Sequence, residues 1–131
     1  MIHPFKDGDQ LQYEHTVTEQ DLASFASGNV HPVYATFSVA RDAEWCCRLF
    51  VLEMKEADEE GIGTFIEVEH VSPAYLGSKV SFTATLENQE KNNVICRFEA
   101  KVGNRVIARG RQGQKILKRE RLEQLFNSIS E

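Results

Sequence analysis

The segment TFSVARDAEWCCRLFVLEMK, residues 36–55, is the longest run of the chain with a clear helical period. Its apolar residues recur at spacings of three and four, and it contains neither glycine nor proline, which is typical of a helix with one buried face. The apolar positions are Val39, Ala40, Ala43, Cys47, Phe50, Val51 and Met54. We therefore expect the central helix of the fold here, with Thr36 or Ser38 as its N-terminal cap.

Before this helix, the alternation of apolar and polar residues over 11–17 predicts a strand with one buried face. Thr18 followed by Asp21 has the spacing of a capping box, which predicts a short helix from Glu19 to about Ala26. Ser27 and the two residues after it would end that helix.

After the central helix, four segments alternate with period two, as antiparallel strands with one buried face do. These strands are expected over residues 64–70, 80–87, 94–101 and 105–117. Gly103-Asn104 has the composition of a two-residue hairpin turn, and Arg119–Ile129 predicts a short amphipathic helix. The pattern favours an α+β fold, with an antiparallel sheet wrapped around one long central helix.

With 131 residues, 41% of them hydrophobic, the chain has the size and composition of a single soluble domain, residues 1–131. The net charge of -5 argues against nucleic-acid binding, which normally needs a basic surface. No apolar run near 18 residues and no signal peptide is found, so we expect no membrane association and a cytoplasmic location.

The charge is unevenly distributed, because basic residues gather between Arg109 and Arg121. One interpretation is a solvated surface. The other is that Arg109 and Arg111 contact the phosphates of a coenzyme.

The three cysteines, Cys46, Cys47 and Cys96, fit no disulfide framework, and each lies among apolar residues of a helix or a strand. We expect them to pack as small hydrophobic side chains, with a catalytic thiol as the alternative. The four histidines lack the close spacing of metal ligands, so no metal site is expected.

Three residues have the chemistry that acyl transfer needs. Thr36 begins the central helix, Glu44 lies eight residues further along it, and His70 ends the apolar face of the next strand. A hydroxyl can position a group, a carboxylate can act as base or nucleophile, and an imidazole can handle protons. Taken singly, Thr36 could be only a cap, Glu44 a partner of Arg48 at the favourable i+4 spacing, and His70 a core residue.

The ordered strings VYAT at 33–36, AEWCC at 43–47, GIGT at 61–64 and EH at 69–70 resemble the hot-dog-fold thioesterases of the fluoroacetyl-CoA thioesterase type. The resemblance extends over about residues 9–127. It implies a hot-dog fold, a catalytic set of Thr36, Glu44 and His70, and a contribution to the site from Gly63.

The resemblance also implies hydrolysis of an acyl-CoA thioester in a homodimer or higher homo-oligomer, with coenzyme A as part of the substrate and no other cofactor. Two positions differ from the family. The segment Ser27–Val30 has no counterpart of the phenylalanine lid, so we expect no strong preference for the fluorinated substrate. Gln114 stands where the family carries an arginine on its last strand.

Two other functions remain open from the sequence. A non-catalytic acyl-CoA binding module would keep the groove but leave Glu44 tied to Arg48. A hot-dog dehydratase or hydratase would use His31 together with Glu44, although the proline-glycine pair that those enzymes place before the helix is missing.

Overall fold

The computed structural model describes residues 1–25 and 28–129, and the side chains of all of these except 24, 25 and 28–30. Two helices, a short 3-10 turn and seven strands follow one another along these residues. In chain order they are β1 (Gln10–Thr16), η1 (Glu19–Asp21), β2 (Leu22–Phe25), β3 (Gly28–Tyr34), α1 (Thr36–Met54), β4 (Glu59–His70), β5 (Lys79–Asn88), β6 (Asn93–Val102), β7 (Arg105–Lys118) and α2 (Arg119–Ser128).

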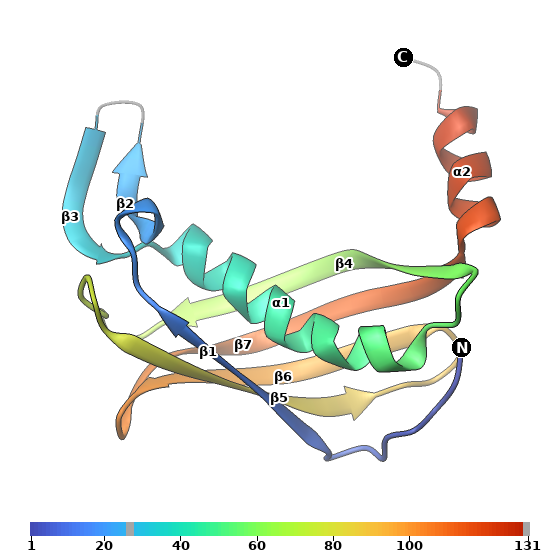
Figure 1. Ribbon diagram of the computed structural model, residues 1–131, viewed down its shortest axis with the longest axis horizontal. Coiled ribbons are helices and arrows are strands. Elements are labelled where there is room, and N and C mark those ends of the chain that lie inside the picture. The colour runs from blue at the N-terminus through green and yellow to red at the C-terminus, as the bar shows by residue number, and fades with distance from the viewer. Residues whose placement is uncertain (26–27, 130–131) are drawn as a thin grey trace.

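Five strands form an antiparallel sheet in the order β1-β5-β6-β7-β4, and the sheet curves around α1 (Figure 1). β2 and β3 pair with each other in a second sheet beyond the N-terminal end of α1, and Val33 of β3 also forms a bridge with Tyr75. The predicted α+β fold, a sheet wrapped around one long helix, is therefore confirmed. β4 lies at an edge of the sheet, beside α1.

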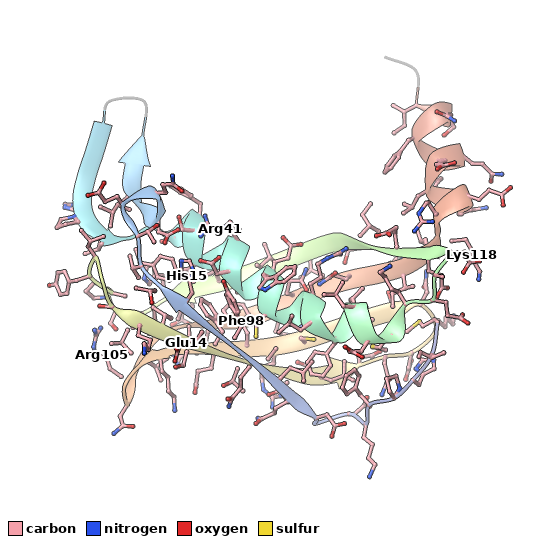
Figure 2. All side chains as sticks on the ribbon, viewed as in Figure 1. Glu14, His15, Arg41, Phe98, Arg105 and Lys118 are labelled. Atoms are coloured by element: carbon pink, nitrogen blue, oxygen red, sulfur yellow. The ribbon has the colours of Figure 1, made fainter. Side chains whose placement is uncertain are left out.

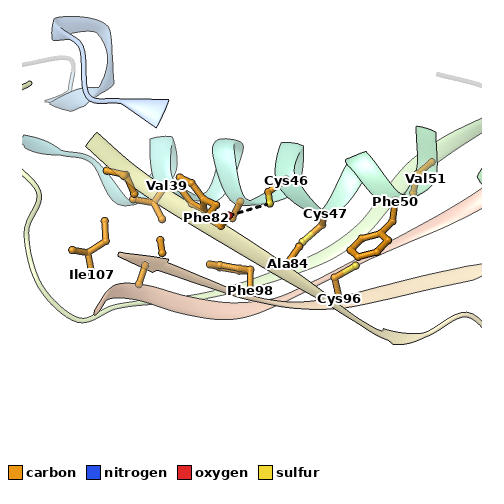
Figure 3. Close-up of a cluster of buried hydrophobic side chains, with 14 of the residues drawn as sticks. Val39, Cys46, Cys47, Phe50, Val51, Phe82, Ala84, Cys96, Phe98 and Ile107 are labelled. Carbon is orange, nitrogen blue, oxygen red and sulfur yellow. Dashed lines mark hydrogen bonds between the residues drawn. The ribbon is translucent and has the colours of Figure 1, made fainter. Parts of the chain in front are cut away.

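The core lies between α1 and the inner face of the sheet (Figure 3). Val39, Cys47 and Phe50 on the helix, and Phe82 and Phe98 on the sheet, are all at most 1% exposed. Burying one such large side chain stabilises the fold by about 1.5–3 kcal/mol. This packing fixes the rotation of α1 and so decides which helix residues face β4.

The predicted helix over residues 19–26 is wrong beyond its first turn. The capping interaction forms, because the carboxylate of Asp21 accepts hydrogen bonds from the Thr18 amide at 2.8 Å and its hydroxyl at 3.1 Å. The chain then turns to extended backbone at Leu22, which pairs with Tyr34 in the β2–β3 hairpin. Strand pairing provides the backbone hydrogen bonds that a longer helix would have supplied. The predicted break at Ser27 lies outside the described residues.

Candidate active site

Thr36, Glu44 and Arg48 lie along one side of α1, since positions four residues apart share a helix face. This side is next to the edge strand β4. Glu44 and Arg48 are half-buried and Thr36 is exposed. The polar residues therefore line a margin between helix and strand that is open to solvent.

Thr36 and His70 meet across this margin. Their side chains form a hydrogen bond of 2.9 Å between Thr36 Oγ1 and His70 Nδ1. The expected capping by Thr36 or Ser38 is wrong, because Ala35 occupies the cap position and the Ser38 hydroxyl has no hydrogen-bond partner among the residues described. The Thr36 hydroxyl is used for the histidine instead.

Burial lowers the pKa of His70, against an opposing hydrogen bond with the Ser72 backbone, so the ring is neutral near pH 7. When the Thr36 hydroxyl donates to Nδ1, the proton of the neutral ring lies on Nε2. Nε2 is buried and has no hydrogen-bond partner among the residues described. A buried donor without a partner is costly, so Nε2 of this tautomer has an unmet hydrogen bond at the margin.

Gly63 lies directly beside the carboxylate of Glu44. A Cβ atom at this position would overlap Glu44 Oε1. Strict alternation would put Gly63 and His70 on opposite faces of β4, but a β-bulge between Gly63 and Phe65 brings both to the face that α1 covers. Only glycine lets the strand pass this close to the carboxylate.

A hydrogen bond from Gln112 on β7 holds Glu44, with 3.0 Å between Gln112 Nε2 and Glu44 Oε1. Gln112 is not among the site residues expected from the sequence. The signal was its place on the inner face of a strand that also carries the buried apolar residues Ala108 and Ile116 on that face. A polar side chain at such a position needs a partner inside the protein.

Glu44 makes no ion pair with Arg48. Arg48 instead donates to the carbonyl of Gly61 at 3.2 Å and forms an ion pair with Glu60 at 3.7 Å. Its guanidinium also donates to Gln114 Oε1 at 3.4 Å. The structural alternative for Glu44, a surface salt bridge with Arg48, is therefore not what the structure contains.

Arg109 and Arg111 lie on the opposite face of the sheet from Glu44, because alternate residues of β7 point to opposite faces. Arg109 pairs with Glu69 at 3.4 Å, and Arg111 pairs with Glu87 at 3.0 Å. Both arginines line a hollow on this outer face. The structure does not bring them together with the three residues at the margin, and their contact with coenzyme phosphates stays a prediction.

One group of side chains among the described residues has the spacing of a metal site: His15, Asp21 and Asp42. Arg41 on α1 and His15 on β1 are labelled in Figure 2. Arg41 binds both carboxylates, at 2.7 Å to Asp21 and 2.9 Å to Asp42. Burial opposes ionisation of Asp21, but hydrogen bonds from Arg41, Thr18 and His15 keep its pKa well below the ordinary value. The cluster is a structural network that joins β1 and η1 to α1.

The three cysteines are at most 1% exposed and none forms a disulfide. Burial raises the pKa of Cys46 to about 11, and a hydrogen bond with Cys96 together with burial raises the pKa of Cys47 further. All three are therefore packed thiols, as predicted from the apolar surroundings, and a catalytic thiolate is disfavoured.

The margin combines a hydrogen-bonded carboxylate, a neutral imidazole with a buried donor, a hydroxyl and a close-lying glycine. The antiparallel sheet that wraps one long helix has the architecture of the hot-dog fold. A family model for fluoroacetyl-CoA-specific thioesterases matches residues 17–120. The chain belongs to this family and is a thioester hydrolase, which confirms the resemblance seen in the sequence.

Solved structures agree with this assignment. A hypothetical protein of Thermus thermophilus, described as a thioesterase superfamily member, is 35% identical over 96% of this chain and 93% of that chain, with a TM-score of 0.91. The fluoroacetyl-CoA thioesterase FlK is 21% identical over 98% of this chain and 100% of its own, with a TM-score of 0.88.

A hot-dog-like protein from Thermanaerovibrio acidaminovorans is 19% identical over 97% of this chain and 95% of its own, with a TM-score of 0.86. No curated protein matches the chain significantly. Among the described residues, no helix has the length and apolar character needed to cross a membrane.

Proposed function

We propose that Glu44 is the essential carboxylate in the hydrolysis of acyl-CoA thioesters, with Thr36 and His70 assisting. The proposal rests on the surroundings of the Glu44 carboxylate. It lies at a solvent-open margin, held by one amide hydrogen bond from Gln112 and not neutralised by Arg48. A binding module without catalysis would be expected to tie Glu44 to Arg48, and this ion pair is missing.

Two routes use the same residues. On the first route, Glu44 attacks the thioester carbonyl and gives a mixed anhydride and coenzyme A thiolate. On the second route, Glu44 removes a proton from a water molecule, which attacks the thioester carbonyl. On the first route, water then hydrolyses the anhydride and restores the carboxylate. Both routes yield the free acid and the coenzyme A thiol.

In the transition state the thioester carbonyl oxygen carries negative charge, and N–H donors directed at this oxygen would stabilise it. His70 Nε2 is one such donor, and His70 also assists the proton transfer to the leaving thiolate. The N-terminal end of α1 is another favourable place for that charge, because the helix dipole is positive there. Thr36 orients the imidazole through its hydrogen bond to Nδ1.

For the acyl group, we propose a short or medium chain or a small aromatic group. The segment Ser27–Val30 carries no aromatic residue that could act as a lid sensing fluorine. Ser27 lies outside the described residues, and the proposal for this segment rests on the sequence. We expect comparable rates for acetyl-CoA and fluoroacetyl-CoA.

We further propose a homodimer formed along β4. This strand of 12 residues lies at an edge of the sheet and exposes Phe65 and Ile66, which are 37% and 38% exposed. A long edge strand presents a row of N–H and C=O groups with which another strand can pair. A second subunit there would lie against the margin that holds Glu44, so that both subunits would build each coenzyme groove.

The test is a thiol-release assay over a panel of acyl-CoA substrates. Glu44→Gln keeps the size of the side chain but removes base and nucleophile, and we expect kcat to fall by about 10²–10⁴-fold. Glu53→Gln, the same change at an exposed position of the same helix, is the matched control and should match wild type. Activity of Glu44→Gln within a few-fold of wild type would refute the role of Glu44. Hydration of an enoyl-CoA without thiol release would favour the hydratase.

A further inference from the structure

Two buried glutamines connect Glu44 to Arg48. Gln114 Nε2 donates to Gln112 Oε1 at 3.0 Å, and Gln112 Nε2 donates to Glu44 Oε1 at 3.0 Å. Arg48 donates to Gln114 Oε1 at 3.4 Å from the other end. Gln112 and Gln114 are only 1% and 2% exposed. We call this chain of hydrogen bonds, from Arg48 through both glutamines to Glu44, the amide relay.

Arg48, at one end of the amide relay, determines which group of each glutamine donates and which accepts. A guanidinium only donates hydrogen bonds, so Gln114 must turn its oxygen toward Arg48 and its NH2 group toward Gln112. Gln112 must then accept with its own oxygen and point its NH2 group at Glu44. With the opposite orientation of Gln112, an amide oxygen would face the carboxylate, and two acceptors repel each other.

We propose that Gln112 is the positioning residue of the active site, and that Arg48 sets its orientation through Gln114. This inference rests on the proposed role of Glu44. The relay fixes Oε1 of the carboxylate, and its second oxygen makes no hydrogen bond to any residue the structure describes. One oxygen is thus held for position while the other remains for the reaction. Because the two glutamines are uncharged, the positive charge of Arg48 stays at a distance from the carboxylate.

The decisive variant is Gln114→Glu, which has the same size and pairs with Arg48 but cannot donate. Gln112 must then turn its NH2 group toward the new carboxylate and present its oxygen to Glu44. A carboxylate displaced by about 1 Å costs about 10²-fold in rate. We expect a fall of this size in kcat with a much smaller change in KM, and the loss of kcat should persist at temperatures where the variant is fully folded, although the buried carboxylate also lowers the melting temperature. A purely structural role of the pair would lower the melting temperature and leave kcat unchanged.

Two further variants keep the test decisive. Gln112→Met removes the donor and should lower kcat similarly, whereas Arg48→Met, at a side chain 28% exposed, keeps the fold and lets both amides turn. For Arg48→Met we expect a smaller loss of kcat. If Gln114→Glu does not fold, Arg48→Met replaces it, and a kcat equal to that of wild type would overturn the proposal.

The control is the same Gln114→Glu change made in the Glu44→Gln background. If the relay acts only through Glu44, the residual rate of the double variant should equal that of Glu44→Gln alone. A further loss in the double variant would overturn the proposal. Full activity of Glu44→Gln would refute the proposed function, whereas an inactive Glu44→Gln with a fully active Gln114→Glu would refute the relay alone.

Discussion

Replacing Gly63 with alanine would put a methyl group where the carboxylate of Glu44 now lies. The added Cβ would overlap Glu44 Oε1 and come within 3.6 Å of its Cδ and 3.8 Å of Gln112 Nε2. Carbon and oxygen atoms need roughly 3.4 Å between them, so the carboxylate must move by about 1 Å. It would then lie away from both the substrate carbonyl and the amide of Gln112.

We expect Gly63→Ala to lower kcat strongly and the free energy of unfolding only slightly. A misplacement of about 1 Å lowers catalysis by about 10²-fold. The atom in the way is the end of a flexible side chain, so the free energy of unfolding should fall by only about 1 kcal/mol, as for a side chain forced off its rotamer. Thiol release at saturating acyl-CoA measures the first quantity, and urea unfolding measures the second.

Gly113→Ala is the matched control. It lies on the neighbouring strand β7, and its Cβ would meet the Phe65 side chain on the face of the sheet away from Glu44. Because its Cβ would not contact Glu44, its kcat should fall far less than that of Gly63→Ala. Wild-type kcat in Gly63→Ala, or an equal loss of kcat in both variants, would refute a specific contact between Gly63 and Glu44.

Three further outcomes are expected. Because burial lowers the pKa of His70, the unfolded chain binds protons more readily than the folded chain near the ordinary pKa of about 6.5. The melting temperature should therefore fall as the pH is lowered from about 7.5 to 5.5, and it should fall less in His70→Asn. Light scattering at micromolar concentration should give the mass of a dimer, and a fully active monomer would contradict pairing along β4. Reversal of Arg109 or Arg111 to Glu should raise KM for acyl-CoA more than it lowers kcat; an unchanged KM would identify the outer face as a solvated surface.

The sequence predicts the regular part of this fold well. The period of three and four over residues 36–55 places α1 within one residue of its observed ends, because one continuous buried face decides both its length and its rotation. Alternation likewise places β5, β6 and β7 within one residue of their observed ends, whereas β4 begins at Glu59, five residues before the strand predicted over 64–70. The β2–β3 hairpin was missed, since Thr18 and Asp21 favour a helix locally and only the pairing of Leu22 with Tyr34 overrides this preference.

The candidate site is predicted less completely, for two physical reasons. The bulge in β4 changes the face of Gly63, and no local pattern of residues 59–70 indicates where an extra residue enters the strand. The partner of Glu44 is Gln112, which is 68 residues away and is brought near only by the pairing of β4 with β7. Arg48, at the favourable helical spacing, was the partner that local sequence suggested.

Because the three cysteines are buried, their reaction with a thiol reagent reports how often the core opens. A thiol reagent that measures released coenzyme A will not react with the folded chain, because Cys46, Cys47 and Cys96 are shielded between α1 and the sheet (Figure 3). Labelling of these thiols requires the helix to separate from the sheet. The rate of labelling without substrate therefore measures how often the core opens, and the same reagent can follow turnover and unfolding in one sample.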